Sequence, residues 1–470
     1  MKKLFLFLLT GFLAIQQIAV LPGCANIIPP TGGPRDSLPP ILVKATPPDS
    51  TRGFKNKTIT FTFDEYVELQ NVQENLLVSP TPETPPVIES KLRTVSIRIK
   101  DTLEANTTYV YDFGNAIKDV NEGNVLKNFT YIFTTGNVLD SLELSGKVIL
   151  AETGGTDTTL IVMLHKSGID SAVAKEKPRY IAKLDGKGFF HFRFLPTGTY
   201  YIYALKEEGG GRLYRSKDQL FAFANEPVDV KSGVQPVTLY ASAEKKETPS
   251  SIVSISTNRG GANRADERRL KFSTNLTSNQ QDLVKIFTLG FDVPLKNFDS
   301  TKLKLSTDSA FVPVKNYSWE LDSLHKKISL KIDWKENTLY NLVLEKEFAQ
   351  DTAGRKLLKT DTLNFVTRKL ADYATIKINF KNFDTLNNPV LLFIQNGQIA
   401  KSYPLTSASF SQALFIPGEY ELRVLTDKNK NGIWDPGDFF NKRKQPELVK
   451  PVNNKITIKA NWDNEFEITL

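Results

Sequence analysis

Short runs in which apolar and polar residues alternate dominate the chain beyond residue 40. Ile59–Phe63, Val95–Ile99 and Phe129–Phe133 each repeat with a period of two. Runs of this kind, separated by Pro, Asn, Asp and Gly, indicate half-buried antiparallel strands. Helical periodicity is almost absent, and only Val67–Leu77 leaves room for one short helical turn. Many short strands at regular spacing predict an all-β protein built of β-sandwiches.

Two sets of motifs recur at long range and predict how the sandwiches are ordered. Asn106–Tyr109 reappears far downstream as Asn337–Tyr340. A different block lies between these copies, and its segment Phe194–Tyr200 matches Phe415–Tyr420, which is one residue shorter. We therefore expect four tandem domains in the order A-B-A-B, each of about 100 residues, a size typical of single sandwiches.

The amino terminus has the pattern of a secretory signal peptide. Two lysines precede an apolar run over residues 4–15, which is shorter than the about 20 apolar residues that cross a bilayer. The only cysteine, Cys24, directly follows the sequence LPG. This arrangement resembles the lipobox of bacterial lipoproteins, which implies cleavage before Cys24 and acylation of that residue. The alternative is an ordinary signal peptide beside a chance cysteine.

The resemblance to lipoproteins also implies a location. An acylated Cys24 would anchor the protein to a membrane, because each buried CH₂ of an acyl chain contributes about 0.8 kcal/mol. Residues 25–40 are rich in Pro and Gly and would form a tether. Ala25 stands where Asp would retain a lipoprotein in the inner membrane, so the resemblance implies the outer membrane. No acidic run follows the cysteine, and this favours the periplasmic face over the cell surface.

The A domains resemble bacterial Ig-like domains first grouped with surface-layer proteins. The first copy carries the strand Ile59–Phe63 followed by DEYV, then Asn106–Tyr109, GNAIKD at 114–119 and FTTG at 133–136. In the divergent second copy the pattern survives at fewer positions, which are Asn337, Tyr340, Asp351 and Phe365–Thr367. The resemblance implies an Ig-like β-sandwich for each copy.

The B domains resemble the transthyretin-like modules found beside carboxypeptidases. The similarity rests on DGKGFF at 185–190 and LPTGTY at 195–200. The tether, with PTGGPRD after the cysteine, resembles envelope lipoproteins of the Bacteroidetes. None of these families is catalytic in itself, so the resemblance implies a protein that is not an enzyme.

The motifs and the changes in composition place the domain boundaries. The polar stretch ASAEKKETPSS near residue 245 has no apolar pattern and predicts a linker between the two A-B pairs. The predicted segments are a lipoprotein signal peptide at 1–23, the lipidated Cys24 and tether at 24–40, an Ig-like domain at 41–138, a transthyretin-like domain at 139–241, a linker at 242–250, a divergent Ig-like domain at 251–368, and a transthyretin-like domain with a calcium-type loop at 369–470.

The distribution of charged residues bears on whether the protein binds nucleic acid. The formal net charge of +8 is spread along the chain, and like charges occur only in short clusters such as KRK at 442–444. A basic arm or stripe, which nucleic-acid binding requires, is missing from the sequence. We therefore expect no nucleic-acid partner.

The segment DKNKNGIWDPGD at 427–438 has the spacing of a calcium-binding loop. Oxygen-bearing side chains stand at positions one, three, five, nine and twelve, and Gly432 at position six supplies the sharp turn. The predicted Ca²⁺ ligands are Asp427, Asn429, Asn431, the carbonyl of Ile433, Asp435 and Asp438. The strand-like flanks set the loop apart from an EF-hand pair. The alternative is a turn held by its own Asn and Asp hydrogen bonds.

Other chemistry-bearing residues do not form a recognisable pattern. Three histidines, His165, His191 and His325, are scattered, and the sequence contains no nucleophile elbow, Walker loop or zinc-protease motif. We expect a non-catalytic, outer-membrane-anchored lipoprotein that acts as an envelope scaffold and contacts another envelope protein. The alternative is an adhesin that binds a glycan or matrix through exposed aromatic residues, for which the four tryptophans are the candidates.

Overall fold

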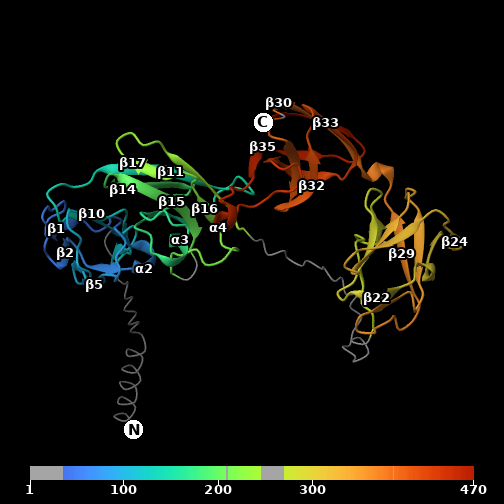
Figure 1. Cartoon of the computed structure of the whole chain (residues 1–470), viewed down its shortest axis with the longest axis horizontal. Helices are drawn as coiled ribbons and strands as arrows, with labels where there is room; N and C mark the ends of the chain where they lie inside the picture. Colours follow the sequence, from blue (N-terminus) through green and yellow to red (C-terminus); the bar gives the residue numbers. More distant parts are fainter. Residues whose placement is uncertain (1–34, 208–209, 245–268, 385) are drawn as a thin grey trace, which may run out of the picture. The chain divides into compact units, whose positions relative to one another are not determined.

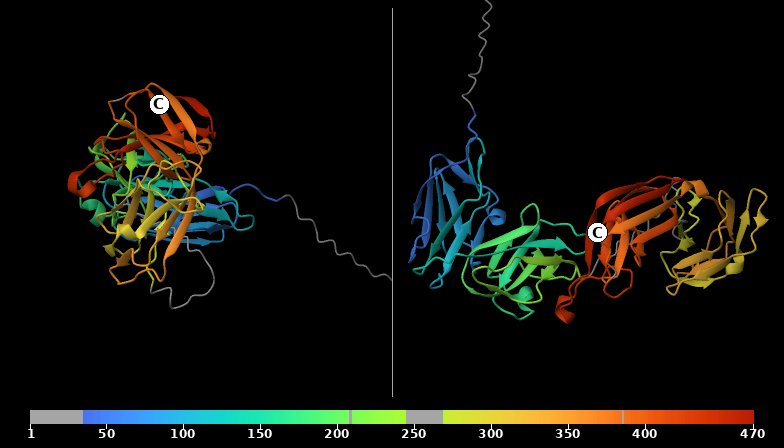
Figure 2. Two further views of the ribbon diagram at one scale, coloured as in Figure 1. Left: turned by 90° about the vertical axis from the view of Figure 1, so that its right-hand side faces the viewer. Right: turned by 90° about the horizontal axis from the view of Figure 1, so that it is seen from above.

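The computed structural model describes residues 35–207, 210–244, 269–384 and 386–470. Strands make up nearly all of their regular structure (Figure 1 and Figure 2), and the α-helices are single turns, α2 (Val72–Asn75), α3 (Ala172–Lys175) and α4 (Phe439–Lys442). The all-β prediction is confirmed, and α2 lies where the sequence left room for a turn. The chain divides into two compact units, Met1–Asp140 and Ser141–Leu470.

The first unit contains one sandwich. Its strands are β1 (Leu42–Thr46), β2 (Thr58–Phe63), β3 (Val67–Leu69), β4 (Leu77–Ser79), β5 (Val87–Lys91), β6 (Thr94–Arg98), β7 (Thr108–Asp112), β8 (Ile117–Asp119), β9 (Val125–Leu126) and β10 (Thr130–Thr134). They form sheets in the orders β1-β2-β6-β5, β10-β7-β4 and β3-β8-β9. The inward positions of the alternating runs, among them Phe61, Ile97 and Phe133, are fully buried and form the core.

A second core lies in the first part of the second unit. Its strands are β11 (Leu142–Leu150), β12 (Leu160–His165), β13 (Tyr180–Lys183), β14 (Phe189–Leu195), β15 (Gly198–Lys206), β16 (Phe221–Phe223), β17 (Val228–Val230) and β18 (Val237–Ala241). One sheet has the order β14-β11-β18, in which β11 and β18 run parallel. The other has the order β13-β12-β15-β16, and β17 also pairs with β15.

A third core follows in the sequence. Its strands are β19 (Ser273–Thr274), β20 (Gln280–Gln281), β21 (Phe287–Gly290), β22 (Leu295–Phe298), β23 (Leu303–Thr307), β24 (Val312–Pro313), β25 (Ser318–Leu321), β26 (Lys327–Lys331), β27 (Leu339–Leu344), β28 (Ala349–Asp351) and β29 (Asp361–Thr367), with 3-10 turns at Ser300–Lys302 and Leu370–Asp372. The sheets have the orders β19-β21-β26-β25, β20-β29-β27-β23-β24 and β22-β28.

The fourth core closes the chain. Its strands are β30 (Ala374–Lys381), β31 (Pro389–Gln395), β32 (Gln398–Pro404), β33 (Ser409–Phe415), β34 (Gly418–Thr426), β35 (Leu448–Ile458) and β36 (Asp463–Thr469). The sheets have the orders β33-β30-β36 and β32-β31-β34-β35, and β30 runs parallel to β36. This is the strand order of the second sandwich, in which β11 and β18 form the parallel pair.

The recurring motif of the first and third sandwiches closes a turn in the same way in both. Asn106 and Asn337 both adopt left-handed backbone angles, with φ of 50° and 47°, which Asn tolerates better than most residues. The amide of the following residue then donates to a threonine hydroxyl at the end of the last strand, Thr135 Oγ1 at 3.0 Å directly after β10 in the first copy and Thr367 Oγ1 at 2.9 Å in β29 in the second. The motif therefore ties a turn to the strand that ends each sandwich.

The match between Phe194–Tyr200 and Phe415–Tyr420 needs a correction. Tyr200 donates its hydroxyl to the carbonyl of Pro196 at 3.3 Å, and Tyr420 donates to Ile416 at 3.0 Å, four residues back in both cases. Equal spacing means that the two segments have the same length, so the predicted one-residue deletion is wrong. In the folded chain Pro196 occupies the position of Ile416 and not that of Pro417.

Several of the predicted segments lie wholly or partly outside the described residues. The signal peptide, Cys24 and most of the tether lie outside them, as do most of the linker and the start of the third predicted domain. Ser242, which the sequence assigns to the linker, is buried and pairs with Phe221 through both backbone groups. The second sandwich therefore continues to at least Ser242.

Candidate functional site

Four of the six predicted ligands in the loop at 427–438 are linked by hydrogen bonds. They are Asp427, Asn429, Asn431 and Asp435. It begins where β34 ends, with Asp427 almost completely buried. The two oxygens of Asp427 accept the amides of Asn431 at 3.2 Å and Gly432 at 2.7 Å. Gly432 has a φ of +75°, which a side chain would strain. Asp427 therefore closes the sharp turn that the spacing predicted.

The remaining polar side chains of the loop bond to one another. Asp435 Oδ2 accepts from the amide side chains of Asn429 and Asn431. Asn429 Oδ1 accepts the amide of Asn431 at 3.1 Å, and Asn431 Oδ1 accepts the amide of Ile433 at 2.7 Å. The proposed ligand side chains of Asp427, Asn429, Asn431 and Asp435 thus each accept N–H donors in this structure. This is the arrangement of the alternative, a turn held by its own side chains.

Asp438 has a different partner. Its side chain accepts the amide of Asn441 at 3.2 Å and so caps the start of α4. Both of its oxygens also receive the Asn441 side-chain amide. The structure therefore does not place Asp438 among the groups that Asp427 and Asp435 collect, because the chain turns into α4 at this point.

Glu447 completes the loop and was missed by the sequence analysis. It is almost fully buried, and its two oxygens accept the amides of Lys428 at 2.8 Å and Asp435 at 3.1 Å. Its carbonyl accepts the indole N–H of Trp434 at 2.8 Å. Glu447 lies beyond α4 at the start of the β35 region, so no short motif links it to the loop. An acidic side chain from outside the calcium-type segment thus binds the backbone of that segment.

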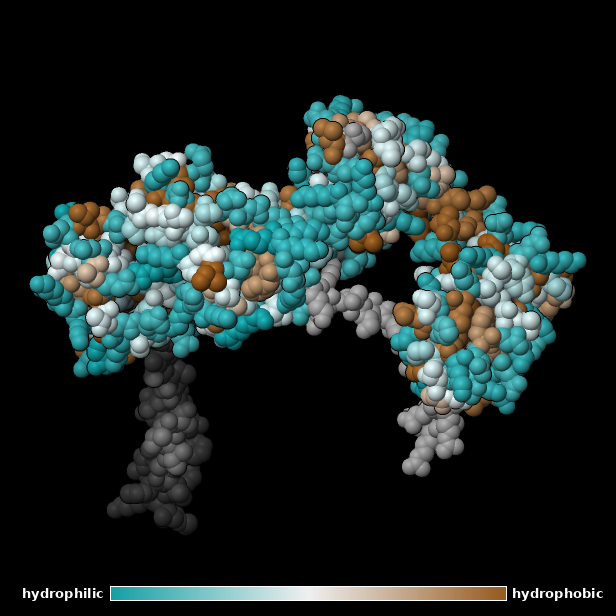
Figure 3. Space-filling view, viewed as in Figure 1, coloured by the Kyte–Doolittle hydropathy of each residue, from teal (hydrophilic) through white to brown (hydrophobic). Residues whose placement is uncertain are grey.

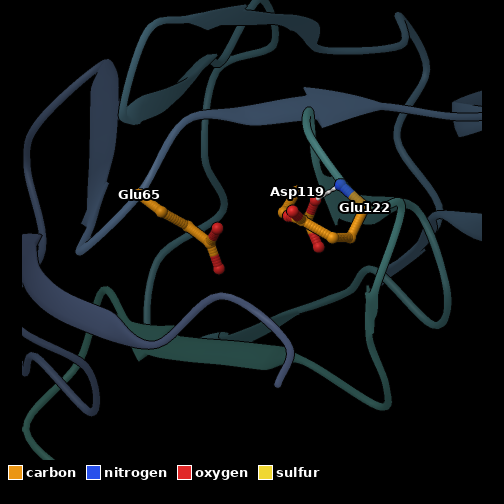
Figure 4. Close-up of side chains that lie close together, drawn as sticks. All are labelled: Glu65, Asp119 and Glu122. Atoms are coloured by element: carbon orange, nitrogen blue, oxygen red, sulfur yellow. Dashed lines mark hydrogen bonds between the residues drawn. The ribbon is translucent and has the colours of Figure 1, made fainter. Parts of the chain in front are cut away.

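A second acidic cluster lies in the first sandwich. One oxygen each of Glu65, Asp119 and Glu122 lies within 4.8 Å of the others (Figure 4). Asp119 is fully buried at the end of β8 and accepts the amides of Glu122, Gly123 and Asn124 at 2.6 to 2.9 Å. Burial opposes ionisation of Asp119, but these N–H groups outweigh it and lower its pKa. Burial, together with the charge of Asp119, raises the pKa of Glu65.

Asp351, the counterpart of Asp119 in the third sandwich, has a different set of hydrogen-bond donors. Asp351 is also fully buried and accepts the amides of Ala353 at 3.0 Å and Arg355 at 2.8 Å. Its other oxygen receives the Arg355 guanidinium at 2.6 Å. Asp119 and Asp351 are therefore both turn residues. In both sandwiches the buried carboxylate holds the backbone of a turn.

The three histidines lie in separate places. His165 is buried on β12, where burial lowers its pKa to about 4. His191 is on β14, in the opposite sheet, with Nε2 at 2.9 Å from Glu143 on the surface. His325 Nδ1 lies 3.3 Å from the carbonyl of Leu295 in a hairpin of the third sandwich. Within the described residues they do not converge on one site.

The tryptophans divide between core and surface. Trp319 and Trp334 pack against the third core, and Trp434 bonds to Glu447 as described. Trp462 is 63% exposed, with the ammonium of Lys459 over its ring at 5.3 Å from the centroid. Trp462 is therefore the tryptophan that offers most of its surface to a ligand.

Cys24 lies outside the described residues, so the structure gives no geometry for the proposed anchor. Across the part of the chain that is described, no helix combines the length and the apolar character that a membrane span requires.

The comparisons with known proteins agree with the fold of the first unit. Residues 36–135 match the model of a family described as bacterial Ig-like domain. Among curated proteins, none matches the sequence.

Several solved structures resemble parts of the chain at low sequence identity. The Bacillus anthracis TIE protein is 12% identical, with 93% of this chain and 75% of that chain covered and a TM-score of 0.17. BcpA, the major pilin subunit of Bacillus cereus, is 8% identical, with 70% and 99% covered and a TM-score of 0.18. The N-terminal part of the bacterial S-layer protein SbsC is 16% identical, with 44% of each chain covered and a TM-score of 0.16. TM-scores of this size do not bear on function. What the comparisons establish is that residues 36–135 match the bacterial Ig-like domain family.

Proposed function

We propose that this protein is a non-catalytic lipoprotein of the outer membrane, whose four sandwiches, two Ig-like and two transthyretin-like in alternation, form a scaffold for another envelope protein. The domain order is supported by the shared strand orders and by the two repeated motifs. The anchor is supported by the signal-peptide pattern and by Cys24 at its end. The periplasmic face of the membrane is part of the proposal.

The observation that carries the proposal is that buried carboxylates accept hydrogen bonds from the backbone of turns. Asp119, Asp351, Asp427 and Glu447 are all buried, and each accepts two or more backbone N–H groups. A buried carboxylate whose oxygens accept backbone N–H groups satisfies those donors and stabilises a turn. These groups therefore serve the fold.

The surface is consistent with this role. Hydrophilic residues cover most of the face seen in Figure 3, and hydrophobic residues gather in separate patches. A scaffold that stays soluble and binds a partner through limited areas has this kind of surface.

The anchor is tested by metabolic labelling with a clickable fatty acid. The wild-type chain should take up the label and fractionate with the outer membrane, and Cys24→Ala should do neither. Protease added to intact cells should leave the protein uncut until the outer membrane is permeabilised. Equal labelling of Cys24→Ala would refute the anchor, and cleavage in intact cells would assign the protein to the cell surface.

A second candidate function is adhesion to a glycan, and the exposed indole of Trp462 is the observation that favours it. Binding on a glycan array that is lost in Trp462→Ala would establish it. Trp334→Ala is the matched control, because Trp334 packs edge-on against Tyr340 in the third core. The scaffold proposal expects no glycan to bind in a Trp462-dependent manner.

A further inference from the structure

Within the second unit, α4 of the fourth sandwich lies against the second sandwich, beside β16 (Figure 1 and Figure 2). The two sandwiches are not neighbours in the sequence, since the third sandwich separates them. Phe439, the first residue of α4, is 1% exposed. Its burial comes from residues more than 200 positions earlier, so the contact joins two separate parts of the chain.

The second sandwich presents an aromatic socket to this residue. The ring of Phe439 lies 5.0 Å from Phe223, 5.2 Å from Phe221 and 5.8 Å from Tyr203, in tilted or edge-on arrangements. Such geometries are those that aromatic pairs prefer. The next residue, Phe440, stacks on Tyr214 at 5.6 Å. We use the term socket for Tyr203, Tyr214, Phe221 and Phe223.

Polar contacts surround the inserted ring. Arg443 pairs with Asp170, and its guanidinium also lies 5.4 Å from the Phe439 ring. Gln445 Nε2 donates to the carbonyl of Phe223 at 2.8 Å and to Asn225 Oδ1 at 2.9 Å. A buried apolar anchor with a polar rim is the usual anatomy of a specific protein interface.

Backbone contacts extend the junction on both sides of α4. The amide of Phe439 donates to Glu244 Oε1 at 2.9 Å, and the amide of Gly437 donates to Ser242 Oγ at 3.3 Å. Further along, the amide of Val449 donates to the carbonyl of Ala151 at 2.8 Å. The junction therefore uses several separate segments of the second sandwich.

We propose that residues 437–445 form a latch that docks into the socket and joins the second and fourth sandwiches into one rigid pair, from which the third sandwich projects as an insertion. The centre of the latch is one continuous helical turn with a cap at each end. Asp438 caps α4 and Arg443 ends it in a left-handed conformation, so one helical turn carries both phenylalanines and the arginine. The latch does not depend on the proposed anchor or scaffold function.

The test measures how often the junction opens. In the full chain with Cys24→Ser, Ser242→Cys places a single thiol at the junction, where the native side chain is 5% exposed. The rate at which a maleimide modifies this thiol reports the population of the opened state when closing is fast. Phe439→Ala should raise the rate at least about tenfold, because truncating a buried phenylalanine costs more than the free energy of a tenfold change.

Two controls keep the result interpretable. Phe311→Ala removes a ring that is 50% exposed in the third sandwich and should leave the rate unchanged. Phe439→Leu keeps an apolar side chain and should restore most of the protection, and circular dichroism of each variant should match that of the parent. Equal labelling rates in the Phe439→Ala variant and its parent would overturn the latch. Protection that disappears on dilution would also overturn it, by assigning the socket to a second copy of the chain.

Discussion

At the scale of single residues, buried carboxylates decide how the turns are built. Asp119 has no solvent exposure and accepts three backbone amides. Replacing it by Ala leaves those donors without a partner inside the protein. We expect Asp119→Ala to destabilise the first sandwich by roughly 2–4 kcal/mol. Calorimetry of the full chain should show one transition moved to lower temperature, whereas the exposed Glu89→Ala should leave it in place. Identical traces for the two variants would contradict this role.

His165 gives the second sandwich a dependence on pH. Burial lowers its pKa to about 4 from an ordinary 6.5, and its Nε2 has no hydrogen-bond partner among the described residues. Below pH 6.5 the unfolded chain binds a proton that the folded one refuses, so stability falls as the pH drops from 6.5 toward 4 and then levels off. The slope from this residue is at most about 1.4 kcal/mol per pH unit.

Substitution isolates this contribution. His165→Phe should remove the part of the slope between pH 6.5 and 4, because the ring still packs edge-on against Tyr203 without binding a proton. His191→Gln, which changes a ring on the surface beside Glu143, should retain it. Thermal unfolding across this pH range makes the comparison. A profile for His165→Phe that overlays the wild type would show that burial of His165 does not matter.

At the scale of elements, the strands could be predicted from the alternating runs. A period of two indicates an extended strand, and its apolar positions indicate the face that is buried. Phe61 and Phe63 point inward as their positions in the run require. The repeated motifs were also readable, since Asn337 and Thr367 lie within short local segments. The latch could not be read in this way. The letters FF at 439–440 do not indicate what covers them, because the socket lies more than 200 residues away.

The loop at 427–438 shows another limit of sequence reasoning. Asn and Asp at alternate positions suit both a calcium site and a self-bonded turn, because the same oxygens bind a cation or accept N–H groups. Position counting also included Asp438, which caps α4, and omitted Glu447, which comes from outside the loop. The folded chain was needed to show that Asp438 caps a helix and that Glu447 contacts the loop.

Calcium binding by this loop stays a prediction. A cation that binds the folded loop and not the unfolded chain stabilises by RT ln(1 + [Ca²⁺]/Kd). We expect millimolar Ca²⁺ to raise the melting temperature of the fourth sandwich relative to a chelator. Asp435→Asn should abolish the shift while preserving the turn, because an amide oxygen still accepts from Asn429 and Asn431. No shift in the wild type, or an equal shift in Asp435→Asn, would leave the loop as a turn only.

At the scale of the whole molecule, the proposed protein is a chain of β-sandwiches that an acylated Cys24 would hold on a membrane. The mature protein would contain no free thiol, because Cys24 is the only cysteine and would be acylated. The sandwiches therefore rely on their cores, on buried carboxylates in their turns and on the latch. A rigid pair of sandwiches with a projecting third would present defined surfaces to a neighbouring protein, as a scaffold requires.

The most direct measurement of the central claim is chemical cross-linking in intact cells with a membrane-permeable, amine-reactive reagent. Lysines are spread along the chain, so a stable neighbour should be captured. We expect one defined cross-linked species of higher mass in the wild type, which disappears in Cys24→Ala at equal expression. The same species in both proteins, or only the uncross-linked chain in the wild type, would contradict an anchored scaffold.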